Sequence, residues 1–155
     1  MSGRIEQRLA ELKIELPGAP MPLSNFVPAV RTGNQLFIAG QTCQYNTERR
    51  FVGRLGAEIT VEQGQEAARN CALNLLAQAR RFLDGDLDRI RRVVRLCGFV
   101  ASTPEFTEQP KVLNGASSLF VDLFGEAGRH VRTAVGSAAL PGGAAVEIEA
   151  VFEIE

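Results

Sequence analysis

Two side chains near the C-terminal end of the chain, Arg132 and Glu147, have the chemistry needed to handle a small acid. A guanidinium presents a planar fork of N–H donors that can hold a carboxylate by two parallel hydrogen bonds, and small residues around Arg132 leave space beside it. A glutamate placed in a cleft can take up a proton and return it. The pair predicts a site that anchors a carboxylate and moves a proton next to it.

The segment that carries both residues predicts a β-hairpin. Residues 131–136 alternate in character, Leu140-Pro141-Gly142-Gly143 interrupts the run, and strict alternation returns from Val146 to Ile154. Because successive side chains of a strand face opposite sides, Glu147, Glu149 and Glu153 should share one face of the second strand. Arg132 and Glu147 would then lie on neighbouring strands. The alternative is an ordinary solvated surface of charged side chains, with Arg132 bridging to Glu147 or Glu149.

A second hairpin is predicted nearer the N-terminus. Residues 26–32 and 35–39 have strand character and flank Gly33-Asn34, a dipeptide suited to a tight turn. Gly40 would end the second strand, where a missing Cβ could let a ligand approach the backbone N–H and C=O. A glycine that only closes a strand is the alternative. Residues 42–56 are polar and irregular and predict a loop with a short strand near Phe51.

The middle of the chain predicts two helices and a strand. Thr60 and Gln63 form a capping box, and the apolar stripe after it predicts a helix to about Phe82, stopped by Asp84-Gly85-Asp86. Residues 87–101 predict a buried strand, and a second helical region starts at Ser102 or Thr103 and ends at Gly125. Asn114 is the polar residue of that region expected to meet a ligand or a turn. The strand's basic cluster favours a solvated or salt-bridged edge over a nucleic-acid contact: Arg89, Arg91, Arg92 and Arg95.

Residues 1–22 form a leader to what we expect to be one domain, residues 1–155. Residues 3–16 have helical spacing of apolar side chains, and a proline-rich connector follows. Interspersed charges and the lack of an apolar core argue against a secretion signal. The helix would pack either on its own domain or on a neighbouring subunit.

Composition narrows the functional classes. The formal net charge of −1 argues against a protein that coats a polyanion, and no apolar run is long enough for a membrane span. Three cysteines without CxxC spacing are expected to be free thiols in a reducing cytoplasm. With a single histidine and no nucleophile placed by a motif, neither a metal site nor a nucleophilic triad is predicted.

The order of predicted elements, strand, strand, helix, strand, helix, strand, strand, predicts an α+β domain with two helices on one face of a mixed sheet. Such a sheet leaves its other face to a partner, with Val131, Val135 and Val151 as candidate contact residues. The oligomer is therefore part of the expected architecture.

Several segments resemble the RidA/YjgF family of reactive-intermediate deaminases, also called endoribonuclease L-PSP proteins. They are RTAVGSAALPGGAAVEIE from Arg132, FVPAV from Phe26, Gly33, LFIAGQ from Leu36, and Asn114 with Phe120. The resemblance covers roughly residues 26–155. It implies a chorismate-mutase-like fold and a homotrimer with clefts between subunits.

The resemblance also implies roles for individual residues. Arg132 would hold the substrate carboxylate, the Gly40 backbone and Asn114 would orient the amino end, and Glu147 would position water and relay its proton. No cofactor is implied. Two substrate-binding positions depart from the family: Phe26 stands where the family has a tyrosine, and Ala134 stands where it has a cysteine. The cleft is therefore expected to be more apolar than in the best-matched deaminases.

Three functions are compatible with this reading. The first is hydrolysis of 2-aminoacrylate-like enamines and imines to 2-keto acids and ammonia. The second is non-catalytic binding of small carboxylates or keto acids in the same cleft. The third is the ribonuclease activity attached to the family name.

Overall fold

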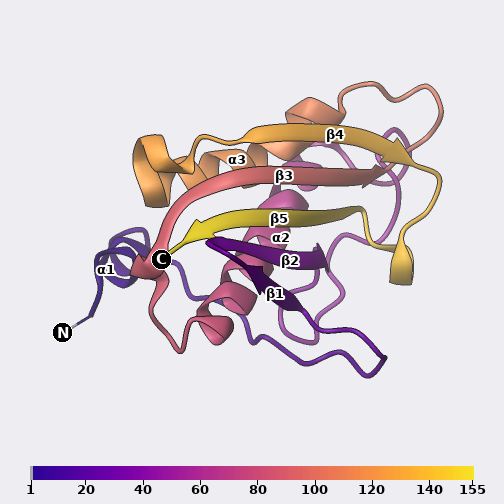
Figure 1. The fold of residues 1–155 in the computed structure, drawn as a ribbon. Helices are drawn as coiled ribbons and strands as arrows, with labels where there is room; N and C mark the ends of the chain where they lie inside the picture. The colour runs from indigo at the N-terminus through magenta and orange to yellow at the C-terminus, as the bar shows by residue number, and fades with distance from the viewer. Residues whose placement is uncertain (1) are drawn as a thin grey trace.

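The computed structural model describes residues 2–155, which form one five-stranded sheet and its covering helices (Figure 1). The principal elements, in chain order, are α1 (Arg4–Glu11), β1 (Ala29–Thr32), β2 (Gln35–Thr42), α2 (Val61–Phe82), β3 (Ile90–Ala101), α3 (Gln109–Phe124), β4 (Val131–Ser137) and β5 (Val146–Ile154). Short 3₁₀ turns lie at Leu87–Arg89, Gly125–Gly128 and Pro141–Gly143. The predicted order of strands and helices after the leader is confirmed.

The sheet is mixed, and its strand order is β1-β2-β5-β3-β4. Strands β3 and β4 are parallel, and the other neighbours are antiparallel. The predicted mixed α+β architecture is therefore confirmed, as is the β1–β2 hairpin around Gly33, whose φ is 60°. The predicted hairpin of residues 131–136 with 146–154 is wrong. Strand β3 lies between β4 and β5, because β4 pairs in parallel with β3 and β5 returns between β2 and β3.

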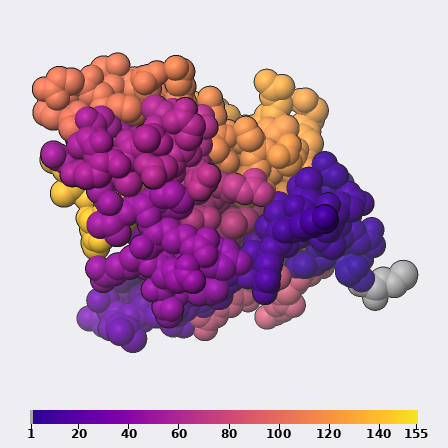
Figure 2. All heavy atoms as spheres, turned by 180° about the vertical axis from the view of Figure 1, so that it is seen from behind, coloured from indigo at the N-terminus to yellow at the C-terminus, as the bar shows by residue number. Residues whose placement is uncertain are grey.

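Helices α2 and α3 cover one face of the sheet (Figures 1 and 2). The capping box predicted at the start of α2 is present, with Thr60 accepting from the Gln63 N–H and Gln63 accepting from the Thr60 N–H. The two helices pack closely at Gly115, where a Cβ would lie 2.0 Å from the Gln65 carbonyl oxygen. Helix α3 begins later than predicted, at Gln109, because residues 102–108 form a bridge, a turn and extended chain first.

The core lies between this helical layer and the sheet. Its largest fully buried side chains include Phe120 of α3 and Phe152 of β5, whose rings lie 5.8 Å apart between centroids. The alternating burial of β5 places Val146, Ile148, Ala150, Phe152 and Ile154 against the helices. The glutamates between them therefore face the other side of the sheet, as predicted.

The leader helix α1 packs on its own domain, the first of the two positions considered from the sequence. Ile5 and Leu9 are buried, and α1 contacts α3. Asp88 accepts hydrogen bonds from the backbone N–H groups of Arg4, at 2.6 Å, and Ile5, at 2.8 Å. These are N–H groups of the first helical turn, which has no side-chain cap from Gly3. The helix is shorter than the predicted 3–16 and ends at Glu11.

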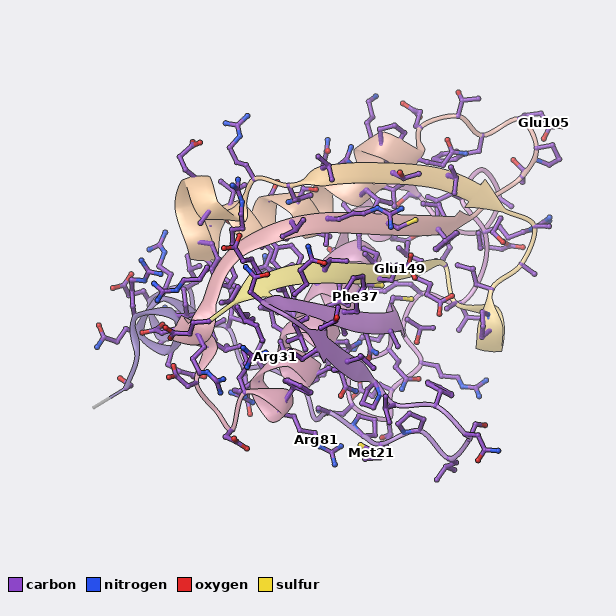
Figure 3. The ribbon with its side chains drawn as sticks, in the orientation of Figure 1. Met21, Arg31, Phe37, Arg81, Glu105 and Glu149 are labelled. Carbon is purple, nitrogen blue, oxygen red and sulfur yellow. The ribbon has the colours of Figure 1, made fainter. Side chains whose placement is uncertain are left out.

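The face of the sheet away from the helices, called the open face below, carries a row of residues in register across all five strands, four of them apolar and one, Arg95, charged. Val30 pairs with Phe37, Phe37 with Val151, Val151 with Arg95, and Arg95 with Val131. Phe37 is 42% exposed and Val131 is 66% exposed. Figure 3 shows Phe37 and Glu149 on this uncovered face. The expectation that Val131, Val135 and Val151 lie away from the helices is confirmed.

Candidate functional site

Arg132 lies on the edge strand β4, and α3 binds its guanidinium. Its Nη1 donates to Asn114 Oδ1 at 2.9 Å and to Ser117 Oγ at 3.1 Å, and its Nη2 donates to the Pro110 carbonyl oxygen at 3.2 Å. The three partners are four and three residues apart, so they lie along one face of the helix. Partial burial lowers the pKa of Arg132 from its ordinary value, although a guanidinium stays charged.

The guanidinium keeps donors for a further ligand. It has five N–H groups, and hydrogen bonds within residues 2–155 use three of them. The two that remain are Nε–H and one N–H of Nη2. They are on two nitrogens bonded to the same carbon, and Arg132 lines a hollow of about 450 Å³ together with Ser117, Arg129 and His130. The arrangement suits a carboxylate that accepts two hydrogen bonds.

His130 joins this site through Ser117. Its Nε2 lies 2.9 Å from Ser117 Oγ, and its Nδ1 lies 2.7 Å from the Gly128 carbonyl oxygen. The Phe120 ring meets the imidazole edge to face at 6.2 Å between centroids. Burial lowers the pKa of His130; the hydrogen bond to Gly128 acts in the opposite direction to a smaller extent, and the positive charge of Arg132 adds a still smaller lowering. The neutral imidazole is therefore favoured near pH 7.

Glu147 and Gly40 form a second group, on the open face. A Cβ added to Gly40 would lie 2.8 Å from Glu147 Oε1, so the carboxylate occupies the space that a side chain at position 40 would need. Gly40 does not end β2 as predicted. The strand continues to Thr42, and its pairing with β5 is interrupted between Ile38 and Gln41. Any larger residue at position 40 would displace the glutamate.

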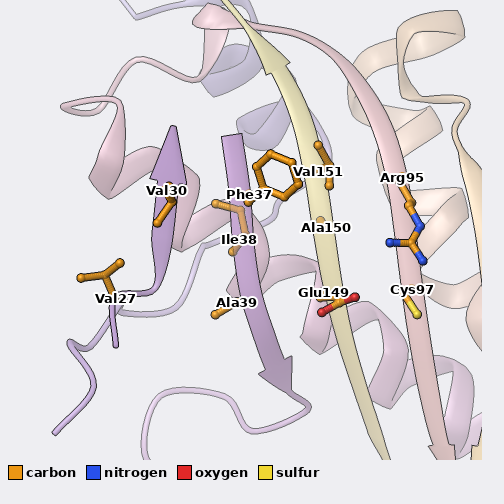
Figure 4. A pocket seen from close by; sticks show the side chains of 10 residues that line it. All are labelled: Val27, Val30, Phe37, Ile38, Ala39, Arg95, Cys97, Glu149, Ala150 and Val151. Carbon is orange, nitrogen blue, oxygen red and sulfur yellow. The ribbon is translucent and has the colours of Figure 1, made fainter. Parts of the chain in front are cut away.

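The environment of Glu147 favours its protonated form. Burial raises the pKa of Glu147 above its ordinary value, and the negative charge of Glu149 raises it further. A hollow of about 290 Å³ lies farther along the same face, lined in part by Phe37, Arg95 and Glu149 (Figure 4). A carboxylate with a raised pKa is suited to accept and return protons closer to neutral pH.

The remaining predicted binding residues do not join one group. Asn114 contacts Arg132 directly, and Ala134 lies two residues after Arg132 on β4, partly buried against the core. Phe26 is 57% exposed and precedes β1, at the edge of the sheet opposite β4. Within one chain, therefore, the predicted residues are divided among the β4 edge, the open face and the segment before β1.

Arg132 and Glu147 are separated by the intervening strand β3 and also lie on opposite sides of the sheet. Arg132 contacts α3 on the helical side of the sheet, while Glu147 lies beside Gly40 on the open face. Among residues 2–155 there is no ion pair between Arg132 and either Glu147 or Glu149. The alternative of an arginine bridging to these glutamates across a hairpin is thus wrong.

Sequence reasoning missed Ser117 and His130 as parts of the site. Ser117 could have been found from its position seven residues after Pro110 and three after Asn114, a spacing that places all three on one helical face. For His130, only its position two residues before Arg132 gave a signal, because its contact with Ser117 depends on the crossing of α3 and β4. No group of three or more metal-ligating side chains occurs within residues 2–155. In the same residues, no helix has the length and apolar character to cross a membrane.

Comparisons with known proteins show similarity over almost the whole chain. Residues 6–150 match a family described as "YjgF/chorismate mutase-like, putative endoribonuclease". Protein TCP17 of Trypanosoma cruzi is 50% identical over 154 residues, which cover 99% of this chain and 96% of that protein.

Two solved structures illustrate the range of structural similarity. Atu1372 of Agrobacterium tumefaciens, a protein of unknown function, is 48% identical with a TM-score of 0.92, covering 98% of this chain and 93% of that one. RidA from the Antarctic bacterium Psychrobacter is 25% identical with a TM-score of 0.57, covering 88% of this chain and 94% of that one.

Proposed function

The chain belongs to the YjgF/RidA family, and from this premise we propose that it hydrolyses reactive 2-enamine and 2-imine intermediates of the 2-aminoacrylate type to 2-keto acids and ammonia. The observation that carries the proposal is how Arg132 is held and which of its N–H donors remain unused in the part of the chain that the structure describes. Its guanidinium is partly buried and bound on one side by α3, it keeps two further donors, and Arg132 lines a hollow. This is a fitting anchor for the carboxylate that these intermediates share.

In the proposed reaction, Arg132 holds the substrate carboxylate while the Gly40 backbone and Asn114 orient the amino end. Glu147 accepts a proton from water as the water oxygen forms a bond to the imine carbon, and the C=N electron pair moves to nitrogen. The protonated glutamate then returns the proton to the nitrogen. Glu147 next moves the hydroxyl proton of this carbinolamine to its nitrogen, and the C–N bond breaks as the oxygen forms C=O, releasing ammonia and the 2-keto acid. The raised pKa of Glu147 supports this double role.

The site requires two copies of the chain, because Arg132 and Glu147 lie on opposite sides of one sheet. We propose a homotrimer in which the open face of one subunit brings Glu147 and Gly40 to the β4 edge of the next. The four apolar side chains of the row from Val30 to Val131 support this assembly, since such side chains are costly to leave in water. The family's cyclic assembly, implied by the resemblance, gives three equivalent clefts.

The charge distribution gives no specific support for RNA as the substrate. Two of the three arginines of β3 have acidic neighbours: Arg92 pairs in register with Glu153 of β5, and Arg91 forms an ion pair with Glu155, after β5, at 2.7 Å. The basic residues of this strand are therefore interspersed with acidic ones and do not form a continuous basic stripe of the kind that tracks a phosphate backbone. The alternative of a binder without turnover uses the same Arg132 anchor.

Ammonia release tests the proposal. The chain is added to a serine dehydratase that generates 2-aminoacrylate, and ammonia is measured before spontaneous hydrolysis is complete. Faster release that depends on Arg132 supports the deaminase. Thermal stabilisation by 2-oxobutyrate without faster release would support the binder instead. RNA cleavage that survives rigorous purification, with no effect on ammonia release, would contradict both.

A further inference from the structure

The hydrogen bonds around Ser117 determine where its proton and that of His130 lie. A carbonyl oxygen only accepts, so the contact with Gly128 requires a proton on His130 Nδ1. In the neutral imidazole, Nε2 is then an acceptor, and the hydroxyl of Ser117 donates a hydrogen bond to it. Since Arg132 Nη1–H only donates, Ser117 Oγ accepts from it. The chain of donors runs from Arg132 to Ser117 to His130 without conflict.

Ser117 and Asn114 together accept from both N–H groups of Arg132 Nη1. One points to Asn114 Oδ1 and the other to Ser117 Oγ, so rotation of the guanidinium would break at least one hydrogen bond. The serine is itself held by the imidazole, which the Gly128 carbonyl and the Phe120 ring fix in turn. The orientation of the two remaining donors therefore depends on residues that do not contact them.

We propose that Ser117 and His130 are positioning residues for Arg132, which hold its Nε–H and free Nη2–H in place for a carboxylate substrate. This inference rests on the proposed role of Arg132 as the anchor and adds the residues that make it selective. A flexible cation attracts any anion, whereas a fixed fork favours a planar carboxylate. The predicted substrate class is thus a compound with a free carboxylate beside the reacting carbon, and its ester or amide should be excluded.

The test compares the binding of 2-oxobutyrate with that of 2-oxobutanamide, a probe of the same shape without the charge. Ser117→Ala should weaken binding of 2-oxobutyrate about tenfold, the usual effect of losing a hydrogen bond to a charged group. Binding of 2-oxobutanamide should stay within about twofold, because the amide cannot use the charged fork in the same way. Ser117→Thr keeps the hydroxyl and should restore the preference for the acid.

Two further variants separate the possible failures. If Arg132→Ala loses the preference for the acid but Ser117→Ala and His130→Asn keep it, the positioning role is wrong and the anchor stands. If Arg132→Ala keeps the preference, or wild type binds neither probe, the anchor itself is wrong. Equal weakening of both probes by Ser117→Ala would show a merely structural serine and overturn the inference.

A spectroscopic readout keeps the inference testable where a variant binds poorly. His130 is the single histidine of the sequence, so its ring ¹⁵N signals are unambiguous. Wild type should show the proton on Nδ1 and an accepting Nε2, and Ser117→Ala should shift the Nε2 signal. A wild-type ring protonated on Nε2 instead would contradict the proposed chain of donors.

Discussion

Arg132 and Glu147 lie on opposite faces of one sheet, with strand β3 between the strands that carry them. Arg132 is held by Asn114 and Ser117 of α3, and Glu147 fills the space above Gly40. A single chain thus presents a carboxylate anchor at one edge and a proton acceptor on the open face. The proposed chemistry requires that neighbouring chains bring the two together.

The anchoring role of Arg132 is tested by two substitutions. Arg132→Ala should lower kcat/KM about 30- to 1000-fold, the usual cost of losing a charged hydrogen-bonding partner. Arg132→Lys should also be impaired, since lysine offers a point charge where arginine offers a fork. Arg129→Ala is the matched control, because Arg129 borders the same hollow but its side chain is 71% exposed and, among residues 2–155, has a single loose ion pair, with Glu126 at 3.8 Å.

Melting temperature and affinity for 2-oxobutyrate, measured on the same sample, distinguish an anchor from a structural arginine. An Arg132→Ala protein that melts like wild type and no longer binds supports the anchor. One that melts early and binds normally shows that the arginine serves only to hold α3 against β4.

The proton-handling role of Glu147 is tested by Glu147→Gln, which should retain 2-oxobutyrate binding and lower turnover about 10²- to 10⁴-fold. The variant should be no less stable than wild type at neutral pH. Because the folded-state pKa of Glu147 is raised, its contribution to stability is present below its unfolded value and is lost as the pH rises through the folded value. Equal turnover in the two proteins would leave Glu147 without a role in proton transfer.

Glu149 should contribute to the pH dependence of the reaction, after the larger effect of burial on Glu147. A general base must be ionised, so kcat/KM should fall as the pH drops through the pKa of Glu147. Since the charge of Glu149 raises that pKa, Glu149→Gln should move the acidic limb of the pH profile to lower pH. Glu153→Gln, on the same face of β5, is the control and should leave the limb in place. An unmoved limb in Glu149→Gln would assign the titration to another group.

The attachment of the leader helix depends on Asp88. Asp88→Ala should lower the free energy of unfolding by about 1–2 kcal/mol, because two N–H groups of the first turn of α1 lose their acceptor. Glu11→Ala, which breaks only an exposed pair with Arg8, should change it by less than about 0.5 kcal/mol. Urea titrations of the two variants would decide, and equal stabilities would mean that α1 is not held at this point.

Local signals in the sequence predicted what is local in the structure. The Thr60–Gln63 capping box and the Gly33 turn involve residues three or fewer apart, and both are present. The partner of a strand is not a local property. Alternation in residues 131–136 and 146–154 predicted two strands correctly, but gave no sign that β4 would pair in parallel with β3.

The same division applies to the site: the residue types could be read from the sequence, but the contacts between distant elements could not. The residue types at Arg132, Asn114 and Glu147 carried chemical information, but the hydrogen bond between Arg132 and Asn114 was not predicted. Ser117 and His130 were missed because a serine on an amphipathic helix and a histidine before a strand are both common solvent-facing residues. Their juxtaposition arises only when α3 packs against β4.

The proposed assembly has a measurable mass as well as a function. Light scattering should show a trimer of about 50 kDa from the 16.8 kDa chain. A stable monomer that is still active would remove the reason for placing the site between subunits.

The most direct test mixes two inactive proteins. Arg132→Ala and Glu147→Gln, co-expressed with different tags and purified through both, form mixed trimers in which one of the three clefts, about one third of the total, combines an intact Arg132 with an intact Glu147 if assembly is cyclic. Ammonia release should therefore recover to about a third of the wild-type rate, while trimers carrying either substitution alone stay inactive. Mixed trimers that remain as inactive as their parents would show that Arg132 and Glu147 do not act together across an interface.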